Sequence, residues 1–153
     1  MFALFDTMKP VETAFMKGEW DGGAFETGHQ TCKWVVDTKF AGKRFNSDRD
    51  VEPVFVWSAG GQKEFYKPNG YAQASKGPQS RLATHCVEVQ ADSSKVGQLR
   101  EVRYRGKVTA TLVYDSLPIM DYFLKVDENT VIAAADNKNK PEGTFFFWLR
   151  RAE

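Results

Sequence analysis

Residues 107–126 read KVTATLVYDSLPIMDYFLKV, and this stretch decides the fold class. Two runs of eight residues, 107–114 and 119–126, alternate between two sets of side chains, as strands do. The segment Ser116-Leu117-Pro118 separates them and is typical of a turn. The stretch therefore predicts two neighbouring antiparallel strands.

Neither face of these strands is purely apolar. Ile119, Asp121 and Phe123 share one face of the second strand, and Tyr114 ends one face of the first. A charge on the inner face of a barrel must be paired, because an unpaired buried charge costs several kcal/mol. The sequence offers bases and acids that could pair inside a barrel: Lys43, Arg44, Arg103 and Arg105 with Asp115, Asp121 and Asp136.

Similar period-two segments continue in both directions along the chain. Gly60-Gly61 lies between 54–57 and 64–66, which indicates a hairpin. Further strands are expected at 82–90, 97–104, 130–135 and 144–150. Many short strands in close succession predict an all-β protein, and successive hairpins favour an up-and-down antiparallel order.

Three segments depart from this pattern. Residues 6–17 predict a short N-terminal helix, with Asp6 as its N-cap and Pro10 in its first turn. Residues 32–38 fit either a helical turn or a strand. Residues 69–80 are rich in Gly, Ser, Pro, Gln and Lys and are expected to form the longest loop, a candidate portal.

Length and composition limit the class. A chain of 153 residues with 42% hydrophobic and 27% charged residues is expected to form one soluble globular domain. Its net charge of +1 gives no field that would favour nucleic acid or an anionic membrane. No apolar run is long enough to cross a bilayer, and the N-terminal residues lack the basic region of a signal peptide. We therefore expect a cytoplasmic protein with Cys32 and Cys86 reduced.

Several motifs, in order along the chain, resemble those of the GXWXG-domain family, whose members carry a second domain of unknown function. The first half matches in three places: Gly18-Glu19-Trp20-Asp21-Gly22, Thr27-Gly28-His29 and Gly42-Lys43-Arg44-Phe45. The second half matches at Tyr104-Arg105-Gly106, Tyr114-Asp115, Pro118-Ile119, Asp121, Phe123, Val126-Asp127 and Phe145-Phe146-Phe147.

The resemblance implies a single calycin-like β-barrel over 1–153, similar in plan to lipocalins and fatty-acid-binding proteins. Residues 1–67 would form the GXWXG half, 68–81 the portal loop and 82–153 the partner half. The family commonly has Met at the positions of Leu112 and Ala135 and Trp at that of Phe40, so an inner cavity would be larger here. Residues 70–81 match the family poorly.

Two residues are candidates for acid/base chemistry. His29 follows Gly28, and histidine titrates near neutral pH. The alternative is a histidine that hydrogen-bonds at the end of a strand. Asp121 interrupts an otherwise apolar face, where it must either pair with a base or act on a ligand.

Other side chains are candidates for binding a ligand or for structure. Lys43 could bind a carboxylate, phenolate or enolate oxygen, and a surface salt bridge is the alternative. The remaining ligand-binding candidates are Arg103, Tyr104, Arg105, Tyr114, Asp115, Phe123 and Phe147. Gly18, Trp20 and Gly22 are expected to be structural, with the glycines allowing close packing around the indole.

Metal and cofactor sites are not expected. His85 and Cys86 are adjacent in a predicted strand and would point to opposite faces, while His29 and Cys32 alone are too few for zinc. No phosphate-binding loop or nucleophile elbow occurs.

Three functions remain open. The first is a monomer or homodimer that binds a small, largely hydrophobic molecule with a polar end. The second is a cofactor-independent isomerase, dehydratase or cyclase acting on such a molecule, for example a polyketide or terpenoid. The third is a haem-binding barrel that uses His29.

Overall fold

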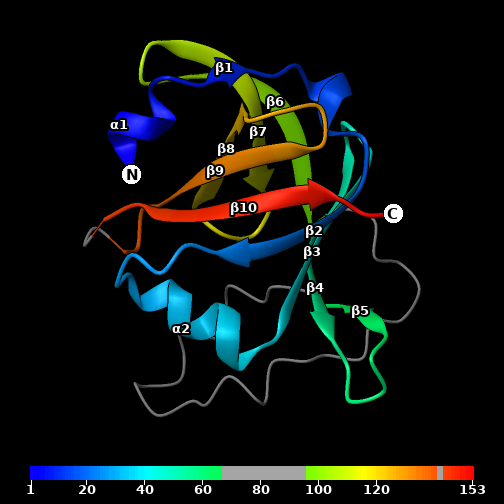
Figure 1. The fold of residues 1–153 in the computed structure, drawn as a ribbon. Helices are drawn as coiled ribbons and strands as arrows, with labels where there is room; N and C mark the ends of the chain where they lie inside the picture. Colours follow the sequence, from blue (N-terminus) through cyan, green and yellow to red (C-terminus); the bar gives the residue numbers. More distant parts are fainter. Residues whose placement is uncertain (67–95, 141–142) are drawn as a thin grey trace.

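The fold is a strongly curved antiparallel sheet with short helices at its ends (Figure 1). A computed structural model describes residues 1–66, 96–140 and 143–153. The N-terminal segment contains α1 (Phe2–Phe5), β1 (Lys9–Pro10) and the 3₁₀ helix η1 (Thr13–Met16), and α2 (Gln30–Asp37) lies between the second and third strands. The remaining strands are β2 (Gly18–Ala24), β3 (Phe40–Ser47), β4 (Asp50–Trp57), β5 (Lys63–Phe65), β6 (Gly97–Tyr104), β7 (Lys107–Tyr114), β8 (Ile119–Lys125), β9 (Thr130–Asn137) and β10 (Phe145–Arg151).

The strand order is β5-β4-β3-β2-β10-β9-β8-β7-β6, and β1 pairs with β8. Apart from β2 and β10, neighbours in this order are consecutive strands of the chain, so each half is an up-and-down meander. The pairing of β2 with β10 joins the two halves. The sheet curls until the turn after β3 reaches β6, where Leu99 N donates to Asp48 O at 2.9 Å. The all-β barrel and the up-and-down order are confirmed.

Most described strands lie where the sequence predicts them, including the hairpin of β4 and β5. The ambiguous segment 32–38 belongs to helix α2. The strand expected at 82–90, the loop at 69–80, the portal loop at 68–81, and His85 and Cys86 all lie outside the described residues.

A short N-terminal helix is present as α1, but one helix over residues 6–17 is wrong, because that range holds β1 and the 3₁₀ helix η1. Asp6 is the C-cap of α1 instead of an N-cap, and Pro10 lies in β1. Val11 bonds to β7 instead of to its own segment: its N–H donates to Thr109 Oγ1 at 3.0 Å, and its carbonyl accepts from Ala110 N at 2.7 Å. These bonds, together with the extended backbone that Pro10 favours in the residue before it, replace a local helix.

Side-chain alternation separates an inner core from an outer cluster. On β8, Asp121 and Phe123 point inward, and Tyr122 and Leu124 point outward. The inner core holds large side chains that are 0–1% exposed: Trp20, Phe45, Val51, Leu99, Leu112, Phe123, Val131 and Leu149. The outer cluster lies against α1 and consists of Phe5, Tyr122, Leu124, Ile132, Ala134 and Phe146.

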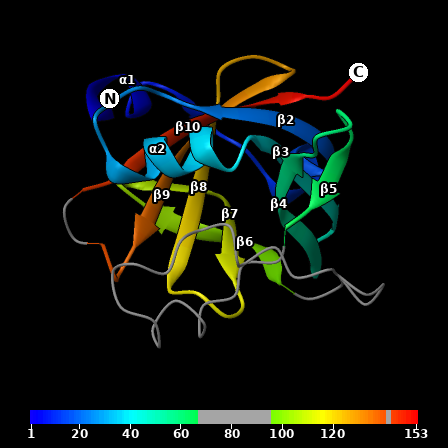
Figure 2. The same cartoon turned by 90° about the horizontal axis from the view of Figure 1, so that it is seen from below.

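Several partly exposed inner-facing side chains lie at one end of the barrel. One rim of the barrel is formed by the ends of β2, β7 and β9 and by the starts of β3, β8 and β10 (Figure 2). We call it the α2 rim, because α2 connects β2 to β3 there. Inner-facing side chains at this rim remain partly exposed, namely Ala24, Phe40, Tyr114 and Ala135.

Candidate functional site

A lysine, a tyrosine and an aspartate from three strands meet on the inner face of the barrel. Lys43 Nζ on β3 lies 3.0 Å from Asp121 Oδ2 on β8 and donates to the Tyr114 hydroxyl on β7 at 2.9 Å. The Tyr114 hydroxyl donates to Asp121 Oδ2 at 3.2 Å. We call Lys43, Tyr114 and Asp121 the polar cluster.

The ion pair of this cluster is fully enclosed. Lys43 is 3% exposed and Asp121 is 2% exposed. Lys43 Nζ also donates to the carbonyl of Pro53 at 2.9 Å, so each of its three N–H groups has an acceptor. An ammonium with all its donors satisfied is well suited to fix the positions of Tyr114 and Asp121.

Aromatic rings surround the Lys43 ammonium. Its Nζ lies 5.0 Å from the ring centre of Phe147, 5.5 Å from that of Tyr114 and 5.7 Å from that of Phe40. These rings attract the cation and exclude water. Low local polarity strengthens each electrostatic interaction of the cluster with any group placed beside it.

Burial shifts the acid–base behaviour of the cluster. Desolvation, with a smaller contribution from the Asp121 carboxylate, raises the pKa of Tyr114 well above its ordinary value, so the side chain stays a phenol. Desolvation lowers the pKa of Lys43, and Asp121 opposes this effect. Tyr114 is the member of the cluster whose side chain is still partly exposed.

His29 lies at the α2 rim as the N-cap of α2. Its Nδ1 accepts from Thr31 N at 3.1 Å, while its Nε2 is buried and has no hydrogen-bond partner in the part of the chain that the structure describes. Its ring centre is 5.7 Å from that of Phe145. Among the described residues, no hydrogen bond or ion pair joins His29 to Asp121, so the two acid/base candidates occupy separate positions.

The other candidate residues occupy three environments. Phe123 and Phe147 face the inner core, with ring centres 6.4 Å apart. Tyr104 stacks on Tyr122 of the outer cluster at 3.8 Å. Arg105 pairs with Asp6 at 2.6 Å, and Arg103 and Asp115 are exposed. The structure does not bring these last four residues to the polar cluster.

Trp20 is part of the inner core. It is 0% exposed, and its Nε1 donates to Met16 O at 2.8 Å. A Cβ added to Gly22 would lie 2.7 Å from Leu149 Cδ2, and one added to Gly42 would lie 1.8 Å from Trp20 O. The glycines near Trp20 therefore allow the strands to approach closely.

Sequence reasoning missed contributors that carry no sequence signal for the site. The carbonyl of Pro53 approaches Lys43 only after β3 and β4 pair, and the ring of Phe40 approaches it along the same strand, β3. Phe145 had a signal, because it precedes Phe147 by two residues and so shares its face.

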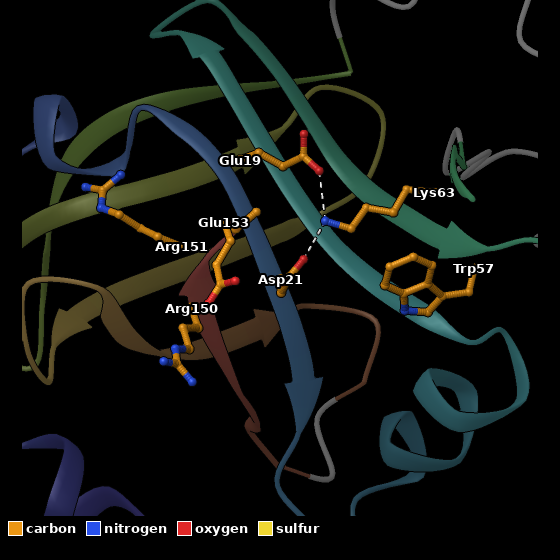
Figure 3. A pocket seen from close by; sticks show the side chains of 8 residues that line it. Glu19, Asp21, Trp57, Lys63, Arg150, Arg151 and Glu153 are labelled. Carbon is orange, nitrogen blue, oxygen red and sulfur yellow. Dashed lines mark hydrogen bonds and ion pairs between the residues drawn. The ribbon is translucent and has the colours of Figure 1, made fainter. Parts of the chain in front are cut away.

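An open pocket of about 470 Å³ lies on the outer side of the sheet (Figure 3). Lys63 bonds there to Glu19 at 2.8 Å and to Asp21. The pocket is lined by Glu19, Asp21, Trp57, Lys63, Arg150, Arg151, Ala152 and Glu153. Its three acidic and three basic side chains balance, so the pocket shows no clear preference for an ion of either sign.

Within residues 1–66, 96–140 and 143–153, no group of three His, Cys, Asp or Glu side chains is placed to bind a metal ion. No helix in the described part of the chain has the length and apolar character needed to cross a membrane.

The fold and the polar cluster define an antiparallel β-barrel with a charge-paired interior. Residues 3–61 match the GXWXG protein family, and residues 95–151 match a domain of unknown function, DUF4334. The chain belongs to the GXWXG family, with the DUF4334 domain as its second half.

One solved structure is similar to the chain over almost its whole length. The crystal structure of a protein from Thermomonospora curvata is 30% identical to this chain, with a TM-score of 0.77, and the match covers 99% of this chain and 85% of that one. No curated protein matches the chain significantly.

Proposed function

We propose that the protein binds a small, largely hydrophobic molecule inside the barrel at the α2 rim, with the polar end of the molecule against Tyr114. The observation that carries this proposal is the enclosed polar cluster beside inner-facing side chains that remain partly exposed. We further propose that the protein acts in the cytoplasm.

Stability alone does not account for the polar cluster. Replacing a buried ion pair by apolar side chains of similar volume is often neutral or stabilising. Lys43 and Asp121 lie among rings and aliphatic side chains that would pack well around such replacements. A role in ligand binding would explain the charged side chains of Lys43 and Asp121, because they orient the Tyr114 hydroxyl.

The cluster favours an oxygen atom as the polar end of the ligand. The Tyr114 hydroxyl can turn from Asp121 toward a carbonyl, carboxylate or phenolate oxygen, and the Lys43 ammonium beside it attracts negative charge. The aromatic surroundings suit the hydrophobic body of the same molecule.

A cofactor-independent isomerase, dehydratase or cyclase is the second candidate. It is favoured by the pairing of a carboxylate with a phenol in a dry environment, where Tyr114 could donate to a developing oxyanion. Asp121 would then remove or return a proton. The substrate would be a hydrophobic molecule such as a polyketide or terpenoid.

Haem binding through His29 does not fit the observed geometry. An axial histidine binds iron through an unprotonated Nε2 and donates its Nδ1–H to an acceptor. In His29, Nδ1 itself accepts a hydrogen bond from Thr31 N, so iron binding would break the helix cap.

Native mass spectrometry of the freshly purified protein, followed by titration of bound molecules into variants, tests the proposal. Tyr114→Phe should weaken binding about tenfold, the order expected for one lost hydrogen bond in an enclosed site. Tyr122→Phe is the matched control, because Tyr122 faces the outer cluster. Equal affinity of Tyr114→Phe and wild type would contradict the proposed site, and a product of changed mass would favour the enzyme.

A further inference from the structure

We infer that the ligand carries a second oxygen at the end opposite the polar cluster and that His29 Nε2–H donates a hydrogen bond to it. The inference rests on the proposed function, because it concerns the same ligand. It adds a requirement on ligand class: a hydrophobic body with a hydrogen-bonding oxygen at each end, such as a phenol that also bears a ketone.

The helix cap fixes the tautomer of His29. A neutral imidazole has one N–H donor and one acceptor nitrogen. Because Nδ1 accepts the N–H of Thr31 at 3.1 Å, the ring proton lies on Nε2. In this tautomer His29 donates at Nε2 and does not accept there, so it acts on a ligand as a hydrogen-bond donor.

This donor has no partner in the part of the chain that the structure describes. Nε2 is buried, and no protein group there accepts its proton. An unsatisfied buried donor costs about 1–3 kcal/mol, and such groups are uncommon in native proteins. An oxygen of a bound molecule would satisfy it.

A column of aromatic rings connects His29 to the polar cluster. The ring of His29 lies 5.7 Å from Phe145, and Phe145 stacks on Phe147 with centres 5.6 Å apart and planes 18° apart. Phe147 in turn lies 5.0 Å from Lys43 Nζ. One polar group therefore lies at each end of two stacked rings.

Short side chains flank this ring column. Ala24 and Ala133 are the cross-strand partners of Phe147, and Ala135 is the partner of Phe145. Ala24 and Ala135 are partly exposed. An elongated apolar molecule placed beside the column would contact the rings along its length and present one oxygen to Tyr114 and the other to His29.

Two probes that differ in one oxygen test this inference. They are 6-acetyl-2-naphthol and 6-ethyl-2-naphthol, in which a methylene replaces the carbonyl. We expect wild type to bind the acetyl compound about tenfold more tightly, the effect of satisfying one buried donor. His29→Asn should remove this preference, because Asn still caps the helix but its shorter side chain does not replace Nε2.

The variants separate failure of the inference from failure of the proposed function. Tyr114→Phe should weaken binding of both naphthols equally and keep the preference for the acetyl compound. If wild type binds both naphthols with the same affinity, or if His29→Asn keeps the preference, the inference is overturned and the proposed function stands. If wild type binds neither naphthol, the inference is overturned, while the proposed function is decided by native mass spectrometry and the Tyr114→Phe titration.

Nitrogen-15 NMR of the histidine ring gives a test that needs no ligand. We expect His29 in wild type to show a protonated Nε2 and an unprotonated Nδ1 at neutral pH. The opposite tautomer, or protonation of both nitrogens, would overturn the inference.

Discussion

Lys43 is the residue whose environment departs furthest from that of an ordinary lysine. It is buried among three aromatic rings, and its charge is matched by one carboxylate. Removing one partner of a buried ion pair leaves the other charge without compensation, whereas removing both does not. Comparing the free energies of unfolding of a single and a double variant therefore shows whether the ion pair is needed for folding.

Asp121→Asn should therefore destabilise the protein by about 3–5 kcal/mol, the cost of leaving the Lys43 ammonium unpaired. The double variant Lys43→Met with Asp121→Leu should recover most of that loss and still fail to bind ligand. Urea unfolding of both variants measures the free energies. A double variant no more stable than Asp121→Asn would show that the pair is needed for folding.

Tyr114 makes the free energy of unfolding depend on pH in the alkaline range. Its folded-state pKa is raised well above the ordinary 10.0 by burial and by Asp121, so the folded state holds the phenol proton more tightly than the unfolded state. The resulting stabilisation is fully present below pH 10 and is lost as pH rises through the folded pKa. Between pH 9 and 11, wild type should lose stability more steeply than Tyr114→Phe in urea unfolding. Parallel curves would contradict the raised pKa.

Substituting two glycines that have positive φ distinguishes the cost of backbone strain from the cost of a steric clash. Gly42→Ala places a Cβ 1.8 Å from Trp20 O, while Gly28→Ala meets no atom within 4 Å. We expect Gly28→Ala to cost about 1 kcal/mol, the strain of that backbone conformation. Gly42→Ala should cost several times more or prevent folding, because β2 and β3 would have to separate. Thermal unfolding of both variants checks this, and equal losses would contradict it.

At the scale of elements, alternation along single strands accounts for much of the molecule. On β8 it sends Asp121 and Phe123 inward and Tyr122 and Leu124 outward. The outward pair would lie against water without α1, whose Phe5 is 2% exposed within the outer cluster. The N-terminal segment is therefore a cover for the outside of the sheet.

Phe5→Ala should destabilise the protein by about 3 kcal/mol or more, because it removes a buried ring from the outer cluster. Leu4→Ala is the matched control in the same helix, since Leu4 is 51% exposed and should cost less than about 0.5 kcal/mol. Urea unfolding measures both. Similar losses would show that α1 packs differently, and ligand binding should be unaffected in either variant.

At the scale of the whole molecule, the two matched family regions contribute strands to one continuous sheet. β2 from the first half pairs with β10 from the second, and β1 pairs with β8. The polar cluster draws Lys43 from the first half and Tyr114 and Asp121 from the second. We propose that residues 1–153 form one domain and one cooperative unit.

Fragments 1–66 and 96–153 should each fail to fold alone, because each would expose a strand edge and half of the inner core. Circular dichroism and proton NMR of the separate fragments measure this. Mixing them should restore part of the β structure. A fragment with a cooperative unfolding transition of its own would contradict the one-domain proposal.

The sequence by itself determined which local structures are available. Period-two alternation identified the strands from Gly97 onward and placed Asp121 and Phe123 on one face, because side chains of a strand must alternate. The close succession of short strands predicted the all-β class, and the family resemblance predicted the calycin-like barrel. Local pattern failed over residues 6–17, where hydrogen bonds from Val11 to Thr109 and Ala110 override the tendency to form a helix.

Only the tertiary structure decided which residues meet. Lys43, Tyr114 and Asp121 are candidates in the sequence, but 71 positions separate Lys43 from Tyr114, and the curl of the sheet brings them together. The same curl leaves Arg105 and Tyr104 on the outside of the barrel, although in the sequence they look equally suitable as ligand-binding residues. The physical reason is that sequence sets the face on which a side chain lies, whereas distance across a barrel depends on how every strand pairs and tilts.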